Sequence, residues 1–165
     1  MVNHRAERLY SETVKPAKTT EKKLPKMERI ASRALYLADR FNPAESCTEH
    51  FFAHKGAGAV TVYFVHALVN IELARRGHIA PLYCAPSTLK KLFGGHGRAD
   101  KDEIRAAVRE QYGVDIEDND QADAFCLAVC ARDHYLLTNG YPPMAPNAVW
   151  QTYHKEKIKG WKRSL

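Results

Sequence analysis

A long, almost uncharged segment, Ala59–Arg75 (AVTVYFVHALVNIELAR), restricts the folds open to this chain more than any other feature. Its apolar residues occupy most of the circumference of a helix, which is unlike a surface helix with one apolar stripe. Such a helix is typical of burial against both a core and a neighbouring element. Gly77 follows at the position where helices commonly end. The fold must therefore bury this segment on several sides.

The rest of the chain alternates strand candidates with helical periodicity. Further helices are predicted over 25–41, 87–93, 101–112 and 120–135. Strands are predicted over 8–14, 46–52 and 79–84. Alternation of this kind indicates an α/β fold with helices on the faces of a sheet. Three strands are few for such a sheet, and Pro81 weakens the last of them because proline cannot donate to a ladder.

Length and charge set broad limits on function. The 165 residues suit one domain, and the net charge of +6 with a pI of about 9.2 favours an anionic partner, nucleic acid first. No apolar run approaches the roughly 20 residues that span a bilayer, and the N-terminus has no apolar signal core. We expect no membrane association and a cytoplasmic location. The four cysteines form no CxxC pair, so they are interpreted as buried thiols of a reducing compartment.

The segment 117–130, EDNDQADAFCLAVC, holds the most informative chemistry. Asp120 and Asp123 are three residues apart at the start of a predicted helix, so they share one face. Two carboxylates placed in this way can hold a hard cation such as Mg²⁺. Aspartates in a first helical turn also serve as caps, and for a lone DxxD capping is the commoner role.

Two other segments have both a chemical and a structural interpretation. Glu49 lies in an apolar strand candidate, where a carboxylate is costly unless it is paired or bound to a metal, or unless it sits at the strand end facing solvent. The loop 94–101, GGHGRADK, is glycine-rich and basic, so its backbone can approach a phosphate closely. It is not a P-loop, and a turn followed by a helix cap at Asp100 explains the same residues.

Taken in order, TEHFF, the long apolar helix, YCAPSTLKKLFGGHGRADKDEI and DNDQADAFCLAV resemble the RuvC family of Holliday-junction resolvases, particularly its shorter phage-type and RuvC-like members. The resemblance covers residues 2–136 and is most specific over 86–129. It implies an RNase H-like fold, a mixed five-stranded sheet flanked by helices, in a nuclease domain over 1–140. The basic tail over 141–165 lies outside the resemblance. It also implies a homodimer, with the long helix in the interface.

The resemblance further implies a crossover junction endodeoxyribonuclease that hydrolyses branched DNA at a two-metal Mg²⁺ site, with Mn²⁺ able to substitute. Glu49, Asp120 and Asp123 match the family's metal ligands, and Lys101 matches a lysine close to the scissile phosphate. Phe52 matches an aromatic that stacks on unpaired bases of a four-way junction. The remaining basic positions expected to contact DNA are Lys90, Lys91 and Arg98.

One family element has no match in the sequence. The family begins with a strand of the form I-x-G-I-D-x-S whose aspartate bridges both metals, whereas Met1-Val2-Asn3 resembles the end of the second strand. A miscalled start or fragment, a degenerate natural form, or a strand supplied by a partner chain would each explain this. Truncation is favoured because loss of a central strand leaves backbone groups uncovered. The sequence therefore predicts weak or absent cleavage by this chain.

Two functions compete with a junction-resolving nuclease. One is a non-catalytic, structure-specific DNA binder of the same fold that uses the basic residues and the tail. The other is an RNase H-like nuclease that acts on a different flap or duplex. The tail ends in KEKIKGWKRSL, which is interpreted as a solvated segment or as a DNA-backbone clamp in which Trp161 stacks on bases.

Overall fold

The computed structural model describes residues 1–2, 10–14, 23–50, 57–142 and 161. The chain divides into two compact units. The first comprises Met1–Thr13, Glu45–His50 and Pro81–Arg163, and the second comprises Val14–Ala44, Phe51–Ala80 and Ser164–Leu165. In the described part, no helix is both long and apolar enough to cross a membrane.

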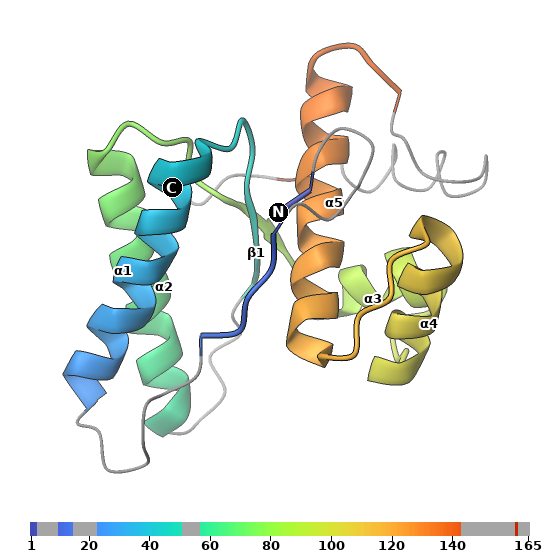
Figure 1. Ribbon diagram of the computed structural model, residues 1–165, viewed down its shortest axis with the longest axis horizontal. Helices are drawn as coiled ribbons and strands as arrows, with labels where there is room; N and C mark the ends of the chain where they lie inside the picture. The colour runs from blue at the N-terminus through green and yellow to red at the C-terminus, as the bar shows by residue number, and fades with distance from the viewer. Residues whose placement is uncertain (3–9, 15–22, 51–56, 143–160, 162–165) are drawn as a thin grey trace. The chain divides into compact units, whose positions relative to one another are not determined.

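The first unit contains a small parallel sheet covered by helices. Strands β1 (Cys47–Glu49) and β2 (Leu82–Cys84) pair in parallel, with Cys47 opposite Leu82 and Glu49 opposite Cys84. In Figure 1, β1 passes along one side of helix α5, and helices α3 and α4 lie on the other. The helices of this unit are α3 (Pro86–Gly94), α4 (Lys101–Tyr112) and α5 (Asn119–Thr138).

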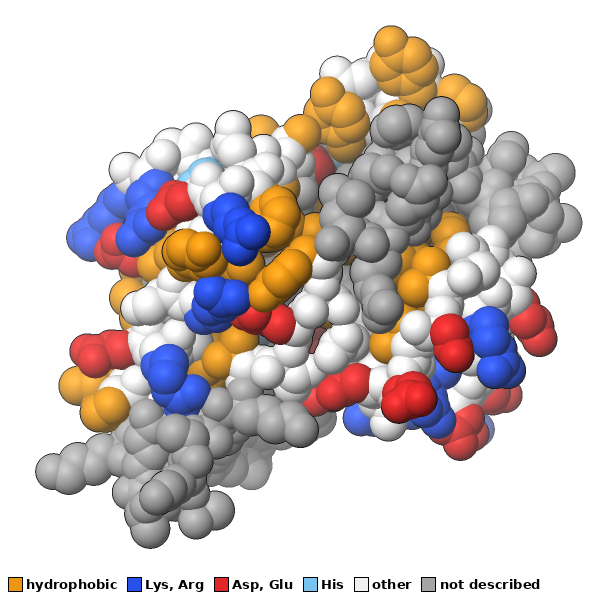
Figure 2. All heavy atoms as spheres, in the orientation of Figure 1, with side chains coloured by type: hydrophobic (Ala, Val, Ile, Leu, Met, Phe, Trp, Pro, Cys, Tyr) orange, Lys and Arg blue, Asp and Glu red, His pale blue; other side chains and the backbone are white. Residues whose placement is uncertain are grey.

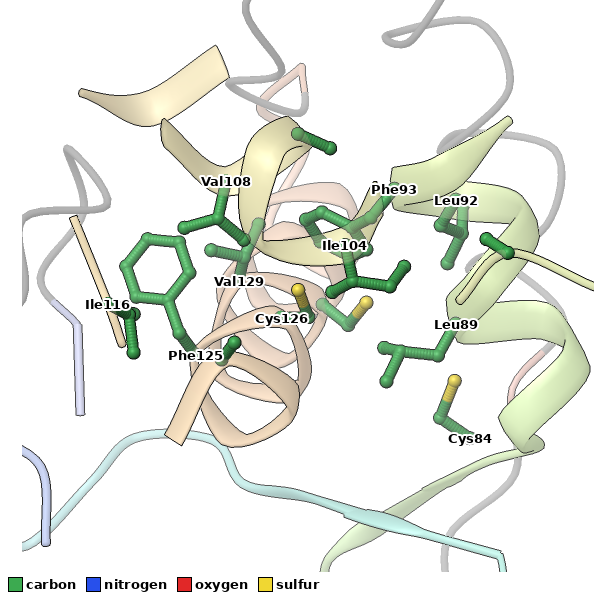
Figure 3. Packing of buried hydrophobic residues seen from close by; sticks show 14 residues of the cluster. Cys84, Leu89, Leu92, Phe93, Ile104, Val108, Ile116, Phe125, Cys126 and Val129 are labelled. Carbon is green, nitrogen blue, oxygen red and sulfur yellow. The ribbon is translucent and has the colours of Figure 1, made fainter. Parts of the chain in front are cut away.

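The core of the first unit forms around α5. Phe125, Cys126 and Val129 point from α5 toward Ile104 and Val108 of α4 (Figure 3). Cysteine is a small apolar residue when buried, and all four cysteines are free thiols that lie in or against this core, as the sequence predicts. The core and its partly buried neighbours also include Trp161. Because Trp161 packs against the core, the prediction that it stacks on DNA is not supported.

The second unit consists of two packed helices, α1 (Lys23–Phe41) and α2 (Ala57–Arg75). Leu35, Ala38 and Leu73 form its buried centre. Asp39 near the end of α1 bonds to Arg76 and His78, which follow α2, so the two helices run in the same direction. Over α1, Lys and Arg side chains stand among apolar ones on the exposed face (Figure 2).

The structure confirms every predicted helix, with shifts of up to three residues at the ends, and corrects the strands. The prediction of a strand over 8–14 is wrong for residues 10–14. There, Ser11 Oγ donates to Gln121 Oε1 at 2.7 Å and Thr13 Oγ1 donates to Asp118 Oδ2 at 3.1 Å, so these hydroxyls bond to the start of α5.

The other two strands are shorter than predicted. β2 begins only after the buried Pro81, which has no N–H for the ladder. The described residues contain two strands, both in one parallel pair, so they do not supply the five-stranded mixed sheet that was expected. Most of the predicted tail over 141–165 lies outside the described residues.

Candidate metal and phosphate site

Glu49 is the last residue of β1, and its side chain is partly exposed and partly covered at the strand end. Partial burial is the main cause that raises the pKa of Glu49, and the negative charge of Asp123 raises it further. Lys90 and Lys101 oppose this effect. Glu49 therefore lies at the strand end, which was one of the two interpretations of its position in the sequence. Its carboxylate is also within electrostatic range of Asp123, Lys90 and Lys101.

The N-terminus of α5 shows which aspartate caps the helix. The N-cap is Asp118, whose Oδ1 accepts hydrogen bonds from the backbone N–H groups of Asp120 at 2.9 Å and Gln121 at 3.1 Å. This cap satisfies two N–H groups that a helix leaves open. Asp120 and Asp123 are consequently available for another role. The sequence analysis did not assign the cap to Asp118, although an aspartate directly before a predicted helix is a common N-cap.

Asp123 is half-buried in the first turns of α5. Partial burial is the main cause that raises its pKa, and the Lys101 ammonium acts against this. The carboxylate of Asp120 raises the pKa of Asp123 as well. Glu49 and Asp123 each have a pKa raised by a neighbouring acid and opposed by Lys90 and Lys101, and such a site favours a bound cation and an anionic ligand.

Lys101 is the first residue of α4, and its Nζ lies 3.9 Å from Asp120 Oδ1. A capping box fixes this helix start, because Asp100 accepts from the backbone of Asp102 and Glu103 while Glu103 accepts from the backbone of Asp100. The side chains of both Lys101 and Asp120 are mostly exposed, at 62% and 76%. Lys101 is therefore held by its backbone and remains accessible to a phosphate.

The glycine-rich loop has a structural reason for at least one of its glycines. A Cβ at Gly94 would lie 2.3 Å from the Cβ of Ala99, so only glycine permits this close approach between the end of α3 and the loop. Gly95 has a φ of 78° and ends α3 in the left-handed region. The helix-cap explanation of the loop is thus confirmed at Asp100, and approach to a phosphate stays a prediction.

The predicted DNA-contacting residues are only partly brought together. Lys90 on α3 acts electrostatically on both Glu49 and Asp123. Lys91 is exposed on the same helix, with its aliphatic part close to Gly97, and Arg98 is exposed in the loop. Phe52 lies outside the described residues. Within the described part of the chain, no three His, Cys, Asp or Glu side chains are close enough together to hold an ion.

Sequence analysis did not identify a buried polar pair farther along the contact between β1 and α5. His134 Nδ1 of α5 lies 3.0 Å from Glu45 Oε2, and both side chains are less than a tenth exposed. The adjacent Arg132 and Asp133 form a second buried ion pair, with Arg132 Nε 2.7 Å from Asp133 Oδ1. The sequence did hold one indication of the position of Glu45. It alternates with Cys47 and Glu49, and residues two apart lie on one face of a strand.

A parallel strand pair covered by helices, with carboxylates at the strand end and on the facing helix, defines an α/β protein of the RNase H-like class. The likeness to the Thermus thermophilus RuvC structure has a TM-score of 0.63 and 25% identity, and covers 84% of this chain and 82% of that one. T. thermophilus RuvC in complex with Holliday junction substrate matches with the same TM-score at 22% identity, which shows the fold alone.

The family model for crossover junction endodeoxyribonuclease RuvC matches residues 1–131, and the chain belongs to the RuvC family. The RuvC of Anaeromyxobacter sp. (strain K) is 30% identical over 105 residues, which are 64% of this chain and 57% of that protein. The RuvC of Synechococcus sp. (strain WH7803) is 28% identical over 106 residues, 63% of this chain and 68% of that protein. The chain thus spans somewhat more than half of these curated relatives.

Proposed function

We propose that this chain provides the metal-binding and junction-binding surface of a crossover junction endodeoxyribonuclease, with Glu49, Asp120 and Asp123 as metal ligands. The observation that carries the proposal is the convergence of Glu49 and Asp123 with Lys90 and Lys101 from four separate elements. Relatives named as crossover junction endodeoxyribonucleases support the reaction class.

The donor set fits Mg²⁺ by its chemistry. Mg²⁺ prefers oxygen ligands and is commonly held by one or two carboxylates, with water and substrate phosphate completing the shell. Glu49 and Asp123 supply such a pair, and the exposed Asp120 side chain would have to turn toward them to add a third carboxylate. When bound, the metal would activate water and neutralise charge on the leaving oxygen. Lys101 and Lys90 would hold the scissile phosphate against the carboxylates.

The test of the metal site uses Mn²⁺ as the probe, followed by electron paramagnetic resonance. We expect Asp123→Asn to weaken Mn²⁺ binding strongly, because it removes a half-buried carboxylate from the site. Asp115→Asn, which changes an exposed acid just before α5, is the matched control and should leave binding unchanged. Equal Mn²⁺ affinity in the two variants would contradict the proposed ligand role.

The phosphate role of Lys101 is tested by binding to a four-way DNA junction at several salt concentrations. Lys101→Ala should weaken binding and reduce the slope of log affinity against log salt by about 1, the effect of losing one phosphate contact. Arg109→Ala, on the exposed side of α4, is the control for general charge loss. A slope unchanged by Lys101→Ala would remove this residue from the DNA surface.

A non-catalytic junction binder is the second candidate, favoured by the lack of a three-ligand group among the described residues. Junction binding that persists in Asp123→Asn, together with no cleavage by the unaltered chain at any Mg²⁺ concentration, would favour the binder. Cleavage that Asp120→Asn abolishes would favour the nuclease. A comparison of junction, flap and RNA–DNA hybrid substrates separates a junction resolvase from another nuclease of this fold.

We further propose that the chain forms a homodimer through α2. Tyr63, Phe64 and Ile71 are each more than half exposed on this helix. Phe64 and Ile71 lie seven residues apart and therefore on one helical face. An apolar surface of this kind is typical of a protein–protein interface.

A further inference from the structure

The contact between β1 and α5 pairs residues in a regular order. Glu45, Cys47 and Glu49 alternate along the strand direction and so project to one side of it. On α5, Asp123 and His134 are eleven residues apart, about three full turns, and therefore share a face. In Figure 1, β1 runs alongside α5. One side of the strand thus faces one side of the helix over several turns.

Three successive interactions follow this face. Glu45 bonds to His134 at one end, with 3.0 Å between Oε2 and Nδ1. In the middle, the partly buried Cys47 of β1 packs against the core cluster that contains the buried Cys130 of α5. At the other end, Glu49 and Asp123 lie within electrostatic range of each other. The strand and the helix therefore run in opposite directions, because Glu45, just before β1, lies beside His134 in the last turns of α5, whereas Glu49 lies near Asp123 in its first turns.

The two ends are separated by similar lengths on both elements. Glu45 to Glu49 spans roughly 13 Å of extended chain, and Asp123 to His134 spans roughly 16 Å of helix. A slip of the strand by one residue would turn Glu49 to its opposite face. A contact that fixes the position of Glu45 consequently fixes which side chain of β1 lies beside Asp123.

The ends differ in their electrostatics. Glu49 and Asp123 carry like charges and repel each other, which works against a close contact between β1 and α5. Glu45 and His134 attract, and their side chains are only 4% and 8% exposed. Buried polar groups are costly unless they are paired, so neither residue can leave the other without penalty. The backbone next to this pair also anchors the sheet, because Leu82 N–H donates to Ser46 O at 2.9 Å.

We propose that Glu45 and His134 form a pin that positions Glu49 opposite Asp123 before any cation binds. This inference rests on the proposed metal site, which gives the positioning its purpose. Glu45 and His134 touch neither substrate nor metal; they act through the strand and the helix. They are positioning residues, and their effect is on the geometry of the carboxylates.

The test measures Mn²⁺ affinity and backbone amide hydrogen exchange in the full chain. Glu45→Ala should lower Mn²⁺ affinity about tenfold, the usual scale for residues that orient metal ligands. It should also speed exchange of the His50 N–H, which donates to Cys84 O beside the end of β1. Glu45→Gln keeps a hydrogen-bonding partner for His134 and should restore both values to near those of the unaltered protein.

The control for general destabilisation is Val108→Ala, which opens a cavity in the α4 side of the core. We expect it to lower stability while leaving Mn²⁺ affinity and His50 exchange unchanged. If Glu45→Ala leaves His50 exchange unchanged, or if Val108→Ala weakens Mn²⁺ binding equally, the pin is disproved. If the unaltered chain binds no Mn²⁺, the proposed metal site fails, and hydrogen exchange alone decides whether the pin exists.

Discussion

Helices α2 and α5 are nearly equal in length, 19 and 20 residues, and each carries apolar residues around much of its circumference. Their environments nevertheless differ. The buried residues of α5 include Phe125, Cys126 and Val129 at the centre of the first unit. Among the described side chains of α2, Leu73 is buried, whereas Tyr63 and Phe64 are mostly exposed. Although α2 is the more apolar of the two, α5 thus forms a core and α2 presents a surface.

The difference separates two roles of a largely apolar helix, which are to form the core of the folded chain and to bind a second molecule. Burial of apolar area stabilises by roughly 25 cal/mol per Å², so α5 stabilises the folded chain itself. The exposed residues of α2 offer the same kind of free energy to a second molecule. Substitutions in α5 should therefore change folding, and substitutions in α2 should change association.

The largest effect is expected in the core around α5. Phe125→Ala should lower the free energy of unfolding by about 4 kcal/mol, because it removes a buried aromatic and leaves a cavity. Phe64→Ala on α2 should change the unfolding of the monomer by less than about 0.5 kcal/mol, as for other exposed sites. Urea unfolding at low protein concentration measures both. Similar losses in the two variants would refute the division between core and surface.

A second large effect concerns the ion pairs. Arg132→Met should destabilise the fold by about 3 kcal/mol, because the fully buried Asp133 carboxylate loses its guanidinium. Arg76→Met in the second unit removes a partner of the exposed Asp39 and should have a much smaller effect. Urea unfolding of the two single variants tests this. If Arg76→Met proves the more damaging, burial is not the deciding factor.

An intermediate effect is expected on association. Tyr63→Glu together with Phe64→Glu should raise the dimer dissociation constant at least about tenfold, since a change of 1.4 kcal/mol gives a factor of ten. Sedimentation velocity over a range of concentrations measures it. Arg109→Glu on α4 produces the same change in net charge and should leave the dimer intact. An unaltered protein that is monomeric throughout would exclude the proposed interface.

The smallest effect is a pH dependence in the second unit. The hydrogen bond with His78 is the main cause that lowers the pKa of Asp39, and Arg76 also lowers it. Because the folded pKa is below the unfolded value of about 3.9, Asp39 stabilises the fold above that value. This contribution is lost as the pH falls through the folded pKa. Asp39→Asn should flatten the urea stability profile below about pH 4, and an unchanged profile would show that Asp39 contributes nothing.

The helices could be predicted from sequence because their signals are local. The apolar period and the cap at Asp100 place α4 at the residues where the structure has it. The false strand over 8–14 shows the limit, since Ser11 and Thr13 alternate as in a strand but bond to residues more than 100 positions away. Period alone does not reveal which partner a polar side chain finds.

The candidate site was predictable in part for the same reason. Asp120 and Asp123 are neighbours on one helical turn, and their spacing is visible in the sequence. Only the structure shows that Asp118, one residue before the helix, is the N-cap. The pairing of Glu45 with His134 joins residues 89 positions apart and has no local signal beyond the alternation in β1.

The close approach of Gly94 to Ala99 has a consequence for the order of assembly. It ties α3 to the start of α4, so Lys90 and Lys101 are carried by one hairpin of neighbouring residues. Contacts between neighbours in sequence close short loops and form quickly, whereas β1 must find α5 across much of the chain. We therefore expect the cationic half of the site to form early in folding, before the carboxylates are brought beside it.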